Sequence, residues 1–128
     1  MPANALICVV DDDDLVRRTM CNALEAAGFK TIEADNGTAG LKAIERVMPA
    51  VAIIDIVMPD REGHDVIVEA TRRFPDLRIL AVSGGGKAPP SERLELALQL
   101  GAHEYLAKPF SMRELVARVT KLSSRKES

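Results

Sequence analysis

The chain has 128 residues and a formal net charge of −2, and 47% of its residues are hydrophobic while 28% are charged. This length suits one compact domain, and the composition excludes a disordered or fibrous chain. Direct binding of nucleic acid is not expected, because it depends on clustered Lys and Arg, which the sequence lacks. No basic segment precedes an apolar one at the N-terminus, and apolar runs reach only strand length, so neither export nor a membrane span is predicted.

The sulfur-containing residues are expected in the interior. Cys8 and Cys21 lie in apolar segments and lack the spacing of a zinc site, so buried free thiols are predicted. Free thiols are typical of a reducing compartment, and a cytoplasmic location is therefore expected. Core filling is the predicted role of the methionines Met20, Met48, Met58 and Met112.

Hydrophobic patterns predict five strands that alternate with five helices. Short apolar runs indicate strands at Leu6–Val10, Lys30–Ala34, 51–54, 79–82 and 103–107. Helical spacing of apolar residues indicates helices at 13–27, from the turn at 35–37 to 47, and at 64–73, 90–100 and 111–122. Gly28 and Gly101 are expected to end helices, and Ser111 with Glu114 has the capping-box pattern.

This alternation predicts the α/β class. Parallel strands need crossover connections, and helices must cover both faces of such a sheet, so we expect a single doubly wound domain with a five-stranded parallel sheet. In sheets of this kind, functional groups gather at the carboxyl ends of the strands. Polar residues follow four of the predicted strands at these ends: Asp11, Asp12, Asp55, Ser83 and Lys108.

These strand-end residues favour phosphoryl chemistry assisted by Mg²⁺. Clustered carboxylates repel one another unless a cation neutralises them, and a hard, oxygen-rich site suits Mg²⁺. The Asp55 carboxylate can act as a nucleophile toward phosphorus, while Ser83 and Lys108 contact phosphoryl oxygens. The acidic run at 11–14 has a second interpretation as a solvated helix start, which is preferred for its last two residues because aspartate is a good N-cap.

Four motifs in chain order resemble those of the receiver domains of bacterial two-component response regulators, of the type found in the chemotaxis response regulator. They read Val9-Val-Asp-Asp12, Ile54-Asp-Ile-Val-Met-Pro-Asp-Arg-Glu-Gly63, Val82-Ser83 and Tyr105-Leu-Ala-Lys-Pro-Phe110. In the family, two acids end one strand, the phosphorylated Asp followed by Met-Pro and a Gly ends another, Thr or Ser ends a third, and Lys-Pro follows the last. The resemblance covers nearly the whole chain and implies a flavodoxin-like fold with strand order 2-1-3-4-5.

The resemblance also implies where phosphate and metal are held. Asp55 would accept a phosphoryl group from a histidine kinase. Mg²⁺, or Mn²⁺ in its place, would be held by Asp11, Asp12, Asp55 and the backbone carbonyl of Val57.

The family's switch residues have counterparts here. Ser83 and Lys108 would contact the phosphoryl group. Ser83 and Tyr105 would form the switch pair that relays phosphorylation to the surface of the fourth helix, the fifth strand and the fifth helix. The peptide bond before Pro109 would be cis.

The resemblance implies a signalling domain that assists its own phosphoryl transfer and slow hydrolysis, rather than a turnover enzyme. Its expected partners are a histidine kinase or histidine phosphotransfer protein, an output partner or output domain, and a second copy after phosphorylation. Residues 1–122 are expected to form the receiver domain, and 123–128 a polar tail or the start of a linker. The segment 84–90, Gly-Gly-Gly-Lys-Ala-Pro-Pro, departs from the family and changes the backbone freedom of the loop after Ser83.

Two other functions are compatible with parts of the sequence. A haloacid-dehalogenase-like phosphatase would use the Asp-x-Asp spacing of Asp11 and Asp13, with Ser83 and Lys108 in support. That function leaves Asp55 unexplained, and the chain lacks the Thr or Val expected after the second acid, a later acidic pair and room for a cap. The other alternative is a degenerate receiver that acts only as an interaction module, which the retention of every site residue disfavours.

Overall fold

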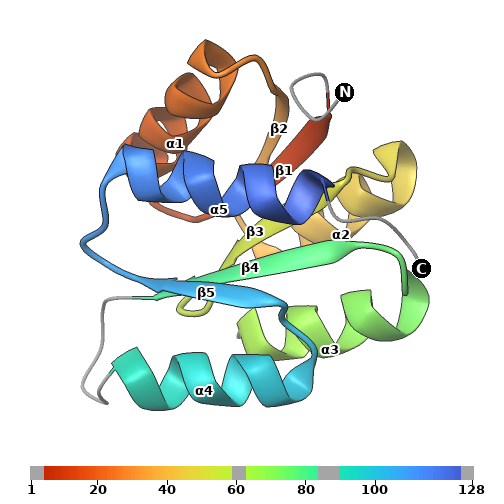
Figure 1. Cartoon of the computed structure of the whole chain (residues 1–128). Coiled ribbons are helices and arrows are strands. Elements are labelled where there is room, and N and C mark those ends of the chain that lie inside the picture. Colours follow the sequence, from red (N-terminus) through yellow and green to blue (C-terminus); the bar gives the residue numbers. More distant parts are fainter. Residues whose placement is uncertain (1–4, 59–62, 84–89, 125–128) are drawn as a thin grey trace.

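The computed structural model describes residues 5–58, 63–83 and 90–124 and shows one sheet flanked by helices (Figure 1). All paired strands are parallel, in the order β2-β1-β3-β4-β5. The strands are β1 (Leu6–Val10), β2 (Lys30–Ala34), β3 (Val51–Asp55), β4 (Arg78–Ser83) and β5 (Glu104–Ala107). The helices are α1 (Asp14–Ala26), α2 (Gly37–Val47), α3 (Gly63–Arg73), α4 (Pro90–Leu100) and α5 (Met112–Ser124). The predicted α/β class, doubly wound sheet and strand order are confirmed.

Helices cover both faces of the sheet and enclose two hydrophobic cores. α1 and α5 pack on one face, and α2, α3 and α4 pack on the other (Figure 1). Because successive side chains of a strand point to opposite faces, Ile7 and Val9 of β1 enter the first core, whereas Cys8 and Val10 enter the second. Because helices cover both faces, the central strands are continuously apolar. Polar groups therefore lie at the ends of the strands.

Helix ends follow the local chemistry of the sequence. The Asp13 side chain accepts a hydrogen bond from the amide of Val16 at 3.1 Å and caps α1. At the start of α5, the Glu114 amide donates to Ser111 Oγ at 3.0 Å and the Ser111 amide donates to Glu114 Oε1 at 3.4 Å, as a capping box requires. After α4, Gly101 has a φ of 130°, a conformation that only glycine adopts at little cost.

The structure corrects one expectation about the core and shifts several element bounds. Met48 is 58% exposed, so the prediction that it fills the core is wrong. It is the C-cap of α2, where the backbone is in the left-handed region with a φ of 49° and the helix ends. β3 extends through Asp55, β5 begins one residue later than expected, and α5 continues to Ser124.

Both cysteines are free and buried, as predicted. Burial raises the pKa of Cys8 to about 12 and that of Cys21 to about 11, because a thiolate loses its hydration in an apolar core. Neither thiol is therefore reactive in the folded chain at neutral pH.

Among the described residues, no helix has the combination of length and hydropathy that a bilayer-spanning segment needs.

Candidate functional site

The carboxyl ends of the parallel strands form one polar edge of the sheet. Asp11 follows β1, Asp55 ends β3, Ser83 ends β4 and Lys108 follows β5. The register carries them to one edge, since Val10 lies beside Ile54 in the β1–β3 pairing and Ser83 lies beside Ala107 in the β4–β5 pairing. The edge thus collects residues that are far apart in the sequence.

Three carboxylates meet at this edge. Oxygens of Asp11, Asp12 and Asp55 lie within 4.8 Å of one another. Asp11 is fully buried and Asp55 is 5% exposed, whereas Asp12 is exposed. Lys108 supplies the opposite charge, with its Nζ 3.1 Å from Asp11 Oδ2 and 3.6 Å from Asp55 Oδ2. One ammonium group therefore faces two buried carboxylates, and the cluster retains excess negative charge.

The electrostatics of the site are dominated by Asp55. Its pKa rises from 3.8 to about 7, chiefly because burial disfavours the charged carboxylate and secondly because the Asp11 carboxylate repels it. Lys108 and the amide of Val57 act in the opposite direction and lower the pKa. For Lys108, burial lowers the pKa, but the carboxylates of Asp55 and Asp11 outweigh burial and the net shift is upward. A cation placed among the carboxylates would relieve the repulsion that raises the pKa of Asp55.

Short loops hold these side chains in place. Asp11 Oδ1 accepts a hydrogen bond from the amide of Asp13 at 2.9 Å, and Asp55 Oδ1 accepts one from the amide of Val57 at 3.3 Å. At the start of α3, the amide of Gly63 donates to the Ile56 carbonyl at 2.8 Å. A Cβ at Gly63 would lie 2.5 Å from the Asp55 carbonyl oxygen, so only glycine fits here.

Ser83 and Tyr105 lie in contrasting environments. Ser83 is fully buried, and its Oγ has no hydrogen-bond partner among the described residues. Such a hydroxyl costs free energy unless a ligand group satisfies it, and a phosphoryl oxygen is an acceptor of the right kind. Tyr105 is 40% exposed on β5, where it lines a cavity of about 410 Å³ with Leu98 of α4 and Arg118 of α5.

The peptide bond between Lys108 and Pro109 is cis, the isomer that the family resemblance implies. Beside it lies an apolar groove of about 340 Å³ between α1 and the start of α5, lined by Leu15, Val16, Thr19, Lys108, Pro109, Phe110 and Met112. Leu15 is 76% exposed in this groove. Apolar surface therefore adjoins the lysine of the site.

The residues present fit a divalent cation. A set of carboxylate oxygens, two of whose side chains are buried, provides the hard ligands that Mg²⁺ prefers. The structure places Asp11, Asp12, Asp55 and Lys108 together and puts the amide of Val57 next to Asp55. The ligand role of the Val57 carbonyl stays a prediction. The segment 84–89, part of the departure from the family noted above, lies outside the described residues.

The position of Asp13, the second acid of the phosphatase alternative, does not support that function. Asp13 is exposed, and its side chain caps α1 through the amide of Val16. It therefore does not join Asp11 as the general acid that the Asp-x-Asp interpretation requires.

Sequence reasoning missed one residue that contacts the site. The guanidinium of Arg17 donates to the backbone carbonyl of Asp11 at 2.8 Å. The only available signal was the position of Arg17, one turn after the Asp13 cap, which returns it to the end of α1 that faces β1.

Comparison with known proteins agrees with the fold. The family model described as the response regulator receiver domain matches residues 7–120. The chain belongs to this family, the receiver domains of two-component signalling systems.

Individual relatives support this assignment. The chain is 33% identical over 127 residues to the alkaline phosphatase synthesis transcriptional regulatory protein PhoP of Bacillus subtilis, covering 97% of this chain and 50% of that protein. It is 34% identical over 119 residues to the response regulator MprA of Mycobacterium leprae, covering 93% of this chain and 51% of that protein. The chain spans about half the length of the curated relatives it matches.

A solved receiver-domain structure has the same fold. The CheY-like response regulator receiver domain protein of Methanospirillum hungatei superposes with a TM-score of 0.86 at 28% identity, over 94% of each chain.

Proposed function

We propose that this chain is a phosphorylation-activated switch in which Asp55 accepts a phosphoryl group in a Mg²⁺-dependent reaction. The observation that supports this most directly is the cluster of the Asp11, Asp12 and Asp55 carboxylates facing the Lys108 ammonium. Asp55 is buried and lies in this cluster, 3.6 Å from the Lys108 ammonium.

The chemistry follows from the position of each group. A carboxylate oxygen of Asp55 attacks phosphorus, a new P–O bond forms, and the bond to the donor breaks with its electron pair leaving on the donor. Lys108 neutralises charge on the phosphoryl oxygens, and the hydroxyl of Ser83, which has no partner among the described residues, donates a hydrogen bond to one of them. Mg²⁺, or Mn²⁺, held by Asp11, Asp12, Asp55 and the Val57 carbonyl, supplies further positive charge when bound.

Intact-mass analysis after incubation with acetyl phosphate tests the proposal. We expect the wild type to gain one phosphoryl group in the presence of Mg²⁺ and none after chelation, and Asp55→Asn to gain none under either condition. Hydrolysis of p-nitrophenyl phosphate that depends on Asp11, without an adduct, would favour the phosphatase. A folded chain with neither activity would indicate a degenerate receiver that acts only as an interaction module.

The proposed switch can be followed at a single chromophore. Tyr105 is the only tyrosine and the chain has no tryptophan, so tyrosine fluorescence reports this residue alone. We expect acetyl phosphate with Mg²⁺ to change the emission as the exposed ring turns inward, since Ser83 moves toward the phosphoryl group. Ser83→Ala should still gain a phosphoryl group by mass but lose most of the fluorescence change. An equal change in both proteins would contradict the coupling.

The partners follow from the same proposal. The donor is a histidine kinase or histidine phosphotransfer protein, and the groove at Leu15 and Phe110 gives it an apolar surface beside Lys108. The output is an attached domain, a separate partner or a second copy, bound at the surface of α4, β5 and α5. Transfer of label from a purified phosphorylated kinase to Asp55 is the measurement that checks the donor class.

The extent of the domain and its location belong to the proposal as well. Residues 1–122 form the receiver, and 123–128, the first two of which lie in the last turn of α5, form a tail or linker start, in a cytoplasmic protein that does not bind nucleic acid through this domain. Limited proteolysis of the full-length protein, followed by mass analysis, checks the boundary.

A further inference from the structure

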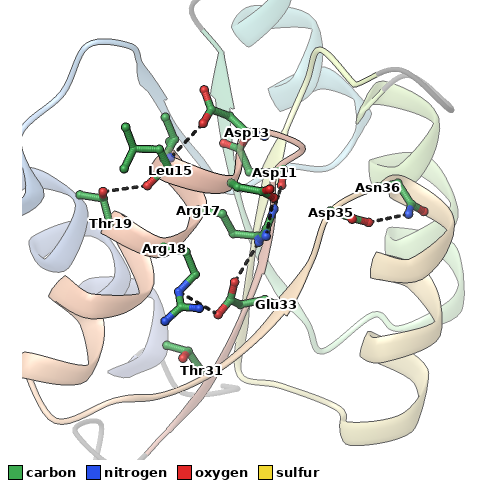
Figure 2. Close-up of polar contacts among 12 residues, drawn as sticks. Asp11, Asp13, Leu15, Arg17, Arg18, Thr19, Thr31, Glu33, Asp35 and Asn36 are labelled. Atoms are coloured by element: carbon green, nitrogen blue, oxygen red, sulfur yellow. Dashed lines mark hydrogen bonds and ion pairs between the residues drawn. The ribbon is translucent and has the colours of Figure 1, made fainter.

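Arg17 is more buried than a charged residue on a surface helix usually is. Its side chain is 12% exposed, whereas that of the next residue, Arg18, is 64% exposed. Each guanidinium nitrogen of Arg17 has its own partner: Nη1 donates to the Asp11 carbonyl at 2.8 Å, Nε to Glu33 at 2.9 Å, and Nη2 to Asp14 at 2.7 Å. In Figure 2, Arg17 lies between Asp11 and Glu33. The planar guanidinium group of Arg17 therefore links the end of β1 to β2 and to the start of α1.

The bond to Asp11 acts on the backbone that carries two of the three clustered carboxylates. The carbonyl of Asp11 and the amide of Asp12 belong to one planar peptide unit. On its other side, Asp11 is held by its own amide, which donates to the Ala34 carbonyl at 3.1 Å. Arg17 thus orients the peptide from which the exposed Asp12 side chain leaves toward Asp11 and Asp55.

We propose that Arg17 is a positioning residue of the cation site, which holds the Asp11–Asp12 peptide so that the Asp12 carboxylate faces those of Asp11 and Asp55. Arg17 touches neither the cation nor the phosphoryl group and acts through the backbone of Asp11. This inference rests on the proposed function, because it assumes that these carboxylates bind Mg²⁺.

The proposal predicts an effect opposite in sign to that of simple charge. Arg17 carries a positive charge 2.8 Å from the Asp11 carbonyl, so its removal would strengthen Mg²⁺ binding if only long-range repulsion between the two cations mattered. If Arg17 holds the ligands in place, its removal weakens Mg²⁺ binding, as loss of groups that orient metal ligands does. The direction of the change therefore separates the two roles.

Isothermal titration of MgCl₂ into the full chain at about pH 8 measures this effect without any reaction. We expect Arg17→Met to raise the Kd for Mg²⁺ about ten-fold. Arg18→Met is the matched control, because it removes the same charge and a 3.6 Å ion pair with the same Glu33. Its Kd should stay within about two-fold of the wild type, since an exposed pair is screened.

A second substitution of Arg17 tests the same role without removing the charge. Arg17→Lys keeps the charge but offers one nitrogen in place of the planar guanidinium group, so we expect a Kd at least about three-fold above that of the wild type. This variant decides the question if Arg17→Met does not fold, as judged by circular dichroism. An unchanged or lower Kd in the Arg17 variants would overturn the positioning role. A wild-type chain that binds no Mg²⁺ would instead contradict the proposed function itself.

Discussion

Replacing Asp55 by Asn should raise the free energy of unfolding of the cation-free protein by about 4 kcal/mol at about pH 8. The reason is the pKa of Asp55, which burial and repulsion from Asp11 raise from 3.8 to about 7 in the folded chain. Asn has nearly the shape of Asp but carries no charge, so the substitution removes the burial cost and the repulsion, which together outweigh the lost attraction to Lys108. The residue proposed to accept the phosphoryl group is thus expected to destabilise the fold.

The sign of the pH dependence follows from the same shift. The folded state holds the Asp55 proton more tightly than the unfolded state does, so ionisation of Asp55 favours unfolding. Below pH 3.8 the carboxyl is protonated in both states and adds no penalty. Between pH 3.8 and about 7 the unfolded chain ionises first, and this contribution to stability falls as pH rises. Above about pH 7 the penalty is complete and constant.

Urea unfolding of the wild type and Asp55→Asn, in chelator and over a series of pH values, measures this contribution as a difference between the two proteins. Asp76→Asn is a control, because Asp76 is an exposed aspartate in the segment between α3 and β4. A difference between the wild type and Asp55→Asn that does not grow from pH 4 to about pH 7 would contradict the interpretation. Saturating Mg²⁺ should stabilise the wild type more than the variant, since a ligand that binds the folded state stabilises it by mass action.

Lys108→Met should slow phosphorylation by acetyl phosphate at least about 100-fold, as loss of one charge-stabilising donor does in other sites. The same change should lower the free energy of unfolding by about 2 kcal/mol at about pH 8. Lys108 is the ammonium within 3.6 Å of both buried carboxylates, and Met keeps a similar apolar stem while removing the charge. The loss stays below that of a fully buried pair because the lysine side chain is 24% exposed and partly screened.

A double-mutant cycle makes this second result specific to the site. In the Asp55→Asn background, Lys108→Met should cost less, because one of its two carboxylate partners is already neutral. Lys121→Met is the matched control, since this lysine is 64% exposed and pairs with Glu104 at 2.8 Å. Its substitution should change neither stability nor phosphorylation measurably. Phosphorylation of Lys108→Met at the wild-type rate would show that the lysine does not stabilise the transferring group.

Local patterns in the sequence were enough to predict the architecture. Continuous apolar runs such as that of β1 indicate strands buried on both faces, and the capping box at Ser111 starts α5 where expected. α4 ends just before Gly101, as predicted, and the backbone at Gly101 adopts a φ of 130° that strains any residue other than glycine. The positions of Asp11, Asp55 and other site residues at strand ends then predicted the site from topology alone, because parallel strands bring their carboxyl ends to one edge.

Other properties depend on distances across the fold, which local patterns do not contain. Met48 has the hydrophobicity of a core residue, but the left-handed end of α2 leaves it 58% exposed. Likewise, packing buries the Ser83 hydroxyl without a hydrogen-bond partner among the described residues, which the sequence does not reveal.

The sequence by itself determined which elements form, in which order, and which residues stand at the strand ends, because periodicity, capping and chain connectivity are local properties. Only the tertiary structure decided how those residues interact. The pKa of Asp55 near 7 arises from burial and from the nearby Asp11, and the contact of Arg17 with the Asp11 carbonyl arises from how α1 packs beside β1. Burial and through-space distance set these energies, and both are consequences of packing rather than of sequence spacing.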